Sequence, residues 1–349
     1  LRLAQPPVQR LPADAQLPGG GRDVAAAVFQ RLRNRFLRQC LQALGRRRFG
    51  RTPRVGDAFC GGGSIPFEAA RLGCEVFASD LNPMAAFLTW SALHLLHQGE
   101  RAMQALRAMQ EEIIKEVDRQ IVEWGIEQNA QGWRADVYLY CTEVVCPECG
   151  WHVPLAPSWA ISTGSGVVAC LMPDEAHSRF EIAIEEGVGP EEVKRAEASG
   201  TVRDSRLYCP HCGRSTPIAA LRRTLRLWEA EDLTPRPGDV FQERLYCIRW
   251  VETWTDEKGV ERTRRHYRAP TAEDEARERK VLELLRERFD DWQARGCIPS
   301  RRIEPGYNTN QPIRERGWTH WHHLFTPRQL LVSGLLLLES GSKGHIRDQ

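Results

Sequence analysis

The sequence has no apolar run long enough to cross a bilayer. Near the C-terminus its longest such stretch is residues 335–338, with residues 330–332 close by. A membrane-spanning helix needs about 20 apolar residues. The first residues also lack the charged start and long apolar core of a secretory signal peptide. These absences exclude the membrane-spanning and secreted classes and predict no membrane partner.

The chain also lacks the cysteine pattern of a disulfide framework. Its 11 cysteines are an odd number, and four of them form two Cys-x-x-Cys pairs. Such pairs are typical of a metal site in a reducing compartment, so we expect a cytoplasmic protein. No period of 20–50 residues repeats along the chain, which excludes a solenoid.

Charge is nearly balanced over the 349 residues but is unevenly distributed. The whole chain carries a net charge of +2, whereas residues 1–54 hold twelve arginines and two aspartates, a local charge of +10. A block this basic is suited to a phosphate backbone. A solvated arginine-rich helix would give the same pattern, and the sequence leaves both interpretations open.

A glycine-rich segment carries the clearest signal for a bound cofactor. Residues 57–64 read Asp-Ala-Phe-Cys-Gly-Gly-Gly-Ser, and Asp80 follows a second strand-like run. Glycine lets backbone N–H groups approach a ligand, and an acidic residue after the next strand can bind ribose hydroxyls. No lysine follows the glycines and the spacing is not Gly-x-Gly-x-x-Gly, so neither a nucleoside triphosphate nor a dinucleotide is favoured.

The surrounding periodicity predicts a strand–loop–helix–strand unit around this segment, with a right-handed crossover. Further along, alternating patterns predict a strand, a β-hairpin and a capped helix. The expected elements are a helix over 23–48, a strand over 54–56, helices over 64–72 and 83–97, strands over 74–79, 137–145, 241–254 and 260–267, and a helix over 271–295.

Residues 57–70 together with 79–83 resemble the S-adenosylmethionine motif of DNA amino-methyltransferases, and most of all the DUF1156-type putative DNA methylases. The likeness returns in islands at residues 51–56, 146–151, 317–321 and 324–331. Many amino-methyltransferases have proline where this chain has Ala58, a change that should alter the loop only slightly. The resemblance implies that the methionine end of the cofactor lies against Phe59, Gly61 and Gly63, its amine near Asp57, its ribose on Asp80 and its adenine beside Asn82.

The same resemblance implies a catalytic tetrapeptide, Asp/Asn/Ser-Pro-Pro-Tyr/Phe, that orients the target amine. No such tetrapeptide occurs in the sequence, so the catalytic residues stay unknown. In the proteins it resembles, the motif lies beyond the Phe-Thr-Pro-Arg-Gln segment at 325–329. We therefore expect an incomplete chain whose catalytic motif comes from a downstream segment or a separate subunit. The DNA partner would be a duplex with its target base flipped out.

The two Cys-x-x-Cys pairs predict a structural zinc site with the ligands Cys146, Cys149, Cys209 and Cys212. Each Cys-x-x-Cys pair forms a tight turn, or knuckle, and two knuckles supply the four thiolates of a closed tetrahedral site. The 59-residue gap between the knuckles indicates a zinc ribbon that carries an insertion. The alternative is two separate redox or unliganded pairs. The nearby histidines His152 and His211 are weaker candidates as ligands.

Three other features admit both a chemical and a structural interpretation. Cys60 has no residue spaced to activate it, so packing is favoured over a nucleophilic role. The aromatic cluster at 318–323 could stack bases or bind metal, although packing is favoured. The basic strand with Arg262, Arg264, Arg265, His266 and Arg268 could follow a phosphate backbone or be an exposed hairpin face. Thr326 and Pro327 are expected to start a helix as its cap and first residue.

The predicted fold class is α/β: a partial Rossmann-like S-adenosylmethionine methyltransferase fold with an inserted zinc ribbon and a β-hairpin/helix region. Expected parts are a flexible lead-in at 1–21, the cofactor-binding half at 22–140, the zinc ribbon at 141–220, the hairpin and helix insertion at 221–297, and the truncated second half at 298–349. The predicted activity is methylation of adenine N6 or cytosine N4 in DNA. The alternatives are an RNA guanine-amine methyltransferase and a non-enzymatic zinc-ribbon nucleic-acid binder.

Overall fold

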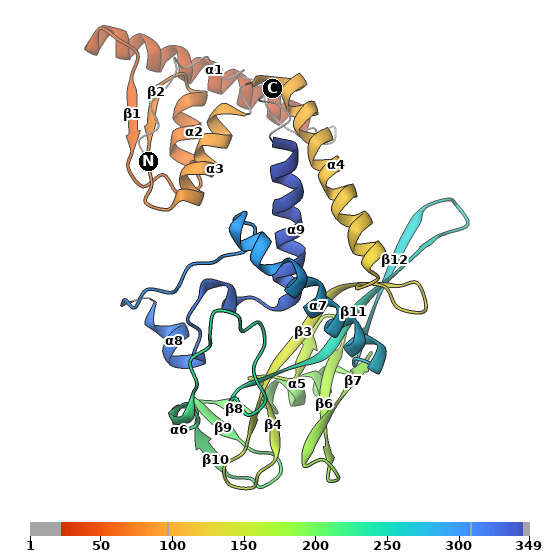
Figure 1. Ribbon diagram of the computed structural model, residues 1–349. Helices are drawn as coiled ribbons and strands as arrows, with labels where there is room; N and C mark the ends of the chain where they lie inside the picture. Colours follow the sequence, from red (N-terminus) through yellow and green to blue (C-terminus); the bar gives the residue numbers. More distant parts are fainter. Residues whose placement is uncertain (1–21, 96–97, 308, 345–349) are drawn as a thin grey trace. The chain divides into compact units, whose positions relative to one another are not determined.

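The computed structural model describes residues 22–95, 98–307 and 309–344, with side chains described between residues 36 and 342 of these ranges. The chain forms two compact units, Leu1–Glu112 and Ile113–Gln349. The expected flexible lead-in at 1–21 lies outside the described residues. Both units combine helices with strands, so the chain is of the mixed α/β class that the sequence predicts (Figure 1).

The first unit contains the predicted strand–loop–helix–strand arrangement. Its strands β1 and β2 pair in parallel, with Val55 opposite Val76. Its elements are α1 (Arg22–Phe49), β1 (Arg54–Asp57), α2 (Ser64–Arg71), β2 (Glu75–Ala78) and α3 (Pro83–His94). Within the described residues these two strands form the whole sheet of the unit. A βαβ unit is therefore confirmed, while the larger Rossmann-like methyltransferase fold stays a prediction.

Local residues set where the helices of the first unit begin and end. Gly73 follows α2 with φ +82°, a left-handed conformation that glycine adopts without a Cβ clash. Asn82 caps α3, because its side chain accepts a hydrogen bond from Met84 N at 2.9 Å, and Pro83 occupies the first turn. The small core of the unit contains Ala69, Cys74 and Val76.

The second unit is built on a seven-stranded sheet in the order β12-β11-β3-β4-β7-β6-β5. All neighbours pair antiparallel except β4 and β7, which are parallel. The strands are β3 (Arg134–Val145), β4 (His152–Leu155), β5 (Ala160–Ser162), β6 (Val167–Asp174), β7 (Arg179–Glu186), β11 (Gln242–Thr255) and β12 (Glu261–Arg268). The predicted hairpin is confirmed as the β11–β12 pair.

The large sheet is curved, so that its edge strand β12 comes back close to β7. Tyr267 N donates a hydrogen bond to Glu186 Oε1 at 2.6 Å, and Arg268 forms an ion pair with the same carboxylate. Val167 of β6 and Cys247 of β11 pack with Tyr267 of β12 in a buried cluster. The curvature therefore closes one core of the unit.

A smaller sheet and several helices complete the second unit. Strands β8 (Val202–Arg203), β9 (Arg206–Tyr208) and β10 (Ser215–Pro217) pair in the order β10-β9-β8. The helices are α4 (Glu100–Trp124), which the division between the units crosses, α5 (Pro190–Ala198), α6 (Ile218–Leu221), α7 (Ala272–Ala294), α8 (Asn310–Arg316) and α9 (Pro327–Gly344), with 3₁₀ turns η2 (Arg222–Thr224) and η3 (Trp321–Leu324). Thr271 caps α7, as the sequence predicts, and the structure adds a capping box with Asp274.

The boundaries between the units differ from those drawn on the sequence. The compact units divide between Glu112 and Ile113 rather than near residue 140. Strand β3, expected at the end of the cofactor half, pairs with β11 from Arg134 opposite Val251 to Glu143 opposite Gln242. This long pairing joins the expected zinc ribbon and the expected hairpin insertion into one sheet. Such a pairing lies about 100 residues apart in sequence and leaves no local signal.

None of the helices in the described part of the chain has the length and apolar character needed to cross a bilayer.

Candidate metal centre and cofactor loop

Two knuckles of the same geometry bring the four predicted cysteines together. The first follows β3, and the second connects β9 with β10. In each knuckle a glycine N–H donates to the carbonyl of the first cysteine, from Gly150 to Cys146 at 2.8 Å and from Gly213 to Cys209 at 3.0 Å. Both glycines have positive φ, +78° and +71°. The turn conformation explains why glycine ends each knuckle.

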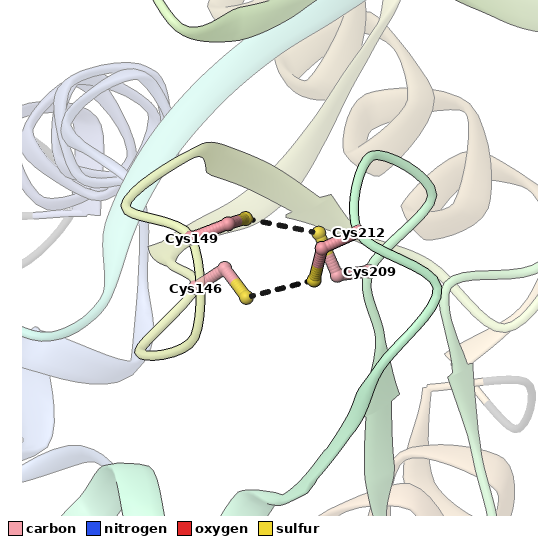
Figure 2. A group of neighbouring side chains, drawn as sticks. All are labelled: Cys146, Cys149, Cys209 and Cys212. Carbon is pink, nitrogen blue, oxygen red and sulfur yellow. Dashed lines mark hydrogen bonds between the residues drawn. The ribbon is translucent and has the colours of Figure 1, made fainter.

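The four sulfur atoms form a cluster of the size that a metal ion requires. All of them lie within 4.8 Å of one another. Figure 2 shows two contacts between the knuckles, Cys146 Sγ to Cys212 Sγ at 3.9 Å and Cys149 Sγ to Cys209 Sγ at 3.7 Å. A tetrahedral zinc site with Zn–S bonds of about 2.3 Å places its sulfurs about 3.8 Å apart. The cluster can therefore hold a metal such as zinc.

Packing around the knuckles fixes their positions. The indole of Trp151, directly after the first knuckle, stacks on the ring of His211 in the second, with ring centroids 3.9 Å apart. Glu148 and Arg214 form an ion pair between the knuckles at 2.8 Å. His211 thus packs against an aromatic ring. Among the described residues, neither it nor His152 belongs to the group that could hold a metal.

The thiols of the cluster have unequal surroundings. Burial raises the pKa of Cys209 to about 12. The backbone N–H of Arg214 instead lowers the pKa of Cys212 below its usual value. Cys146 and Cys209 are buried, whereas Cys149 and Cys212 are partly exposed. With four thiolates the coordination sphere is complete, so the site would stabilise the fold and would have no open position for catalysis.

The glycine-rich loop in the first unit is held by backbone hydrogen bonds between the two strand ends. Cys60 N donates to Ser79 O at 3.0 Å, and Ser79 N donates to Asp57 O at 2.9 Å. Gly61 and Gly63 have φ values of +51° and +83°. A Cβ on Gly63 would lie 2.7 Å from Thr89 Oγ1, so only glycine fits there. A Cβ on Gly61 would have no atom within 4 Å, so the backbone there is accessible.

Asp80 joins the loop after β1 to the loop after β2. Its Oδ2 accepts a hydrogen bond from Gly61 N at 2.9 Å, and its Oδ1 accepts one from Asn82 N at 2.8 Å. The N–H groups of Asn82 and Gly61 lower the pKa of this carboxyl below its usual value. The predicted residues Gly61, Asp80 and Asn82 are therefore brought together at adjacent strand ends.

The other predicted cofactor residues, Asp57 and Phe59, lie at the start of the loop. Asp57 Oδ1 accepts a hydrogen bond from Phe59 N at 3.1 Å, and this bond shapes the start of the loop. The Phe59 side chain is 78% exposed. Cys60 is buried and accepts a hydrogen bond from Thr89 Oγ1 at 3.3 Å, a position in keeping with the packing interpretation.

The aromatic cluster at 318–323 lies inside the second unit. His322 and His323 are buried, and His323 packs beside Trp228 with ring centroids 5.1 Å apart. Thr319 N donates a hydrogen bond to His323 Nδ1 at 3.1 Å. In the described ranges these histidines do not form a group that could hold a metal. Their geometry agrees with packing.

The basic strand is β12, at the outer edge of the large sheet. Part of its charge is neutralised by ion pairs, from Arg262 to Asp256 at 2.9 Å and from Arg268 to Glu186. His266 is paired with Glu252 at 2.9 Å. Arg264 and Arg265 are exposed. The end of the hairpin extends beyond the paired part of β3 (Figure 1), and its residues 252–265 contain four acidic and four basic side chains. This balance weakens the case for a phosphate-binding face.

Sequence reasoning did not predict a buried clasp between α9 and the large sheet. Arg328 is 7% exposed, forms an ion pair with Glu278 of α7, and donates to Ile126 O at 3.2 Å. Its guanidinium lies 3.9 Å from the centroid of the Tyr138 ring, and Glu278 also accepts a hydrogen bond from Tyr140 at 2.6 Å. The Phe-Thr-Pro-Arg-Gln segment was the available signal, but only the helix start at Thr326 and Pro327 was predicted from it.

No protein-family profile, curated protein or solved structure matches this chain. The candidate sites therefore depend on the geometry and on the residues themselves.

Proposed function

We propose that the chain is part of an S-adenosylmethionine-dependent DNA amino-methyltransferase acting on adenine N6 or cytosine N4. The observation that carries the proposal is the hydrogen bond from Gly61 N to Asp80, which joins the glycine loop to the acidic residue across two parallel strand ends. Nucleotide-like cofactors bind at this edge of a parallel sheet.

The residues at this edge suit the chemical groups of S-adenosylmethionine. The first turn of α2 has no side-chain cap at Gly63, so its N–H groups can receive a carboxylate. Asp80 supplies carboxylate oxygens for the ribose hydroxyls. Asn82 lies at the start of α3 and would lie beside the adenine. When bound, the cofactor would supply an electrophilic methyl group, while these residues would bind and orient it.

The missing tetrapeptide limits what this chain can do alone. Such a motif accepts the hydrogens of the target amine and positions its lone pair toward the methyl group. We propose that a further segment or a separate subunit supplies it. Support comes from α3, where Met84, Phe87 and Leu88 are 63%, 58% and 53% exposed. A helix that is apolar on all sides is normally buried against other elements.

Arginines at the end of α1 support a nucleic-acid partner. Arg46, Arg47 and Arg48 form the last turn of this helix and are exposed. A cluster of this kind attracts a phosphate backbone. DNA is the partner that the proposal names. Competition between duplex DNA and structured RNA for the purified chain tests this, because a clear preference for RNA would favour a guanine-amine methyltransferase instead.

Calorimetric titration of the full chain with S-adenosylmethionine tests the cofactor site. We expect binding by the wild type and a loss of at least tenfold in Asp80→Ala, since hydrogen bonds to charged groups contribute roughly 1.5–3 kcal/mol. Asp256→Ala is the matched control. Asp256 also accepts N–H bonds in a turn, from Lys258 and Val260, but lies in the β11–β12 hairpin. Equal binding by Asp80→Ala and wild type, or no heat from either, would refute the assignment.

A second candidate function has its own support, namely the four-cysteine cluster in a compact second unit. In this alternative the chain is a non-enzymatic, zinc-organised nucleic-acid binder. DNA binding that persists in a chain unable to bind S-adenosylmethionine would favour it. Loss of DNA binding in Asp80→Ala, together with loss of the cofactor, would favour the methyltransferase.

A further inference from the structure

A cavity of about 510 Å³ lies in the second unit, and its walls include the large sheet and α7. Its volume is in the range of small-molecule sites, roughly 300–1,000 Å³. Glu243 lies opposite Thr142, and Leu245 lies opposite Tyr140, so these four side chains share one face of the sheet. The hydrogen bond from Tyr140 to Glu278 joins α7 to this face.

Most charged groups around the cavity already have partners. Arg244 donates to Phe180 O at 2.6 Å, to Glu143 at 3.1 Å and to Glu181 at 3.3 Å. Glu278 is occupied by Arg328 and Tyr140. These groups hold the walls together and are not free to bind a charged ligand.

Glu243 differs from Arg244 and Glu278 in having no such partner within the described part of the chain. No cation of the described residues lies within ion-pair distance of its carboxylate, and no hydrogen bond to it is formed there. The side chain is exposed, yet burial raises the pKa of its carboxyl, with Arg316 acting in the opposite direction. Both properties fit a carboxylate that protein atoms surround and that water reaches through the cavity. Arg316 itself donates to Thr142 Oγ1 at 3.1 Å.

We propose that this cavity binds a planar group with two parallel N–H donors, such as a guanidinium or the N1/N2 edge of guanine, and that Glu243 is its acceptor. A carboxylate accepts two parallel N–H bonds in a bidentate arrangement, which gives both affinity and orientation. Arg244 is satisfied by its three partners, and Arg179 lies 3.7 Å from Glu181. Arg279 and Glu275 are exposed on the α7 side of the cavity, so the carboxylate of Glu243 is the open acceptor on the sheet side and favours N–H donors there. The inference concerns the second unit and holds whether or not the first unit binds S-adenosylmethionine.

Calorimetry on the full, zinc-loaded chain tests the proposal with two pairs of probes. Guanosine is compared with inosine, which lacks the 2-amino group, and arginine with citrulline, which is neutral. We expect one member, guanosine or arginine, to bind roughly tenfold or more tightly than its partner probe, as removal of a donor to a charged acceptor predicts. Guanosine binding assigns the cavity to a base, and arginine binding assigns it to a guanidinium. Either result supports the proposal.

Variants locate the acceptor. Glu243→Gln should lose roughly tenfold or more in affinity, whereas Glu275→Gln, which changes an exposed carboxylate on the α7 side of the cavity, should bind like wild type. If Glu243→Gln does not fold, Glu243→Asp keeps the charge and should retain the discrimination against inosine or citrulline. Absence of binding by all four probes at millimolar concentration, no discrimination within either pair, or equal affinity of Glu243→Gln and wild type would overturn the proposal.

Discussion

The two units differ in how completely they bury their apolar side chains. In the second unit, Leu285, Leu331 and Leu335 are fully buried. In the first unit, Leu81 is 91% exposed and Phe59 is 78% exposed. The buried apolar side chains among its described residues are small ones: Cys60, Pro66, Ala69, Cys74 and Val76. The second unit thus has a core of its own, whereas hydrogen bonds between strand ends hold the glycine-rich loop of the first.

The largest effect should come from removing metal from the second unit. A structural zinc site contributes apparent binding free energies of roughly 10–16 kcal/mol, so chelation or Cys209→Ser should abolish the cooperative unfolding transition of this unit. Tryptophan fluorescence reports on it, because the chain has 11 tryptophans and all but Trp90 follow Glu112. Zinc content measured by mass spectrometry should be one ion per chain.

Cys170→Ser serves as the control for that experiment, since Cys170 is a partly exposed cysteine on β6 outside the cluster. It should keep the zinc and the transition. An unchanged transition in a chain shown to hold no metal would contradict a metal-dependent core.

Breaking the buried clasp should have the next largest effect. Arg328→Met removes the cation and leaves Glu278 partly buried without its partner, which we expect to cost about 2–4 kcal/mol in the free energy of unfolding. The double variant Arg328→Met/Glu278→Gln should recover part of this loss, because it removes the uncompensated charge. Urea denaturation followed by tryptophan fluorescence measures both. If the single variant were as stable as wild type, the clasp would not stabilise the second unit.

Acid should destabilise the second unit through its buried histidines. Burial, together with smaller contributions from His322 and His320, lowers the pKa of His323 to about 3. In the unfolded chain His323 takes up a proton near pH 6.5, but in the folded chain it stays neutral until about pH 3. The effect of His323 on the free energy of unfolding is therefore absent above pH 6.5. Between pH 6.5 and about 3 the free energy of unfolding falls by about 1.4 kcal/mol per pH unit.

The variant His323→Asn isolates this contribution. Its amide oxygen can still accept the hydrogen bond from Thr319 N, and it has no proton to take up. Its stability should fall less steeply between pH 6.5 and 4, by about one proton. Identical slopes for wild type and His323→Asn would show that His323 titrates normally.

The smallest effect is expected at the exposed apolar surface of the first unit. Leu81→Ser should change the free energy of unfolding by no more than about 0.5 kcal/mol, as for other surface substitutions. Leu331→Ser, at a fully buried site of the second unit, should cost several kcal/mol, roughly 3 or more. A large loss of stability in Leu81→Ser would mean that a partner or another part of the chain covers this residue.

Much of the local structure was readable from the sequence. Thr271 predicted the start of α7, and the glycines at 61 and 63 predicted a loop between a strand and a helix. The four clustered cysteines were predictable because each Cys-x-x-Cys knuckle has its own spacing, and the structure brings the two knuckles together. The cap and the glycines are each signals confined to a few residues. The two knuckles are separate local motifs whose thiols can ligate the same metal.

The rest depends on contacts between distant residues. Nothing near Glu143 indicates that it lies beside Gln242, and nothing near Arg328 names Glu278 as its partner. The compact units also differ from the regions expected from the sequence. The long pairing of β3 with β11 joins the expected zinc ribbon and the expected hairpin insertion into one sheet. The Glu243 cavity is also invisible in the sequence, since its walls come from several strands and a helix.

Hydrogen exchange of the full chain, with and without S-adenosylmethionine, tests the central proposal most directly. The account predicts added protection of the amides at residues 57–64 and 79–83, where Gly61 and Asp80 meet, and little change in the knuckles at 146–150 and 209–213. Unchanged exchange at both strand ends under saturating cofactor, or protection confined to the second unit, would contradict it.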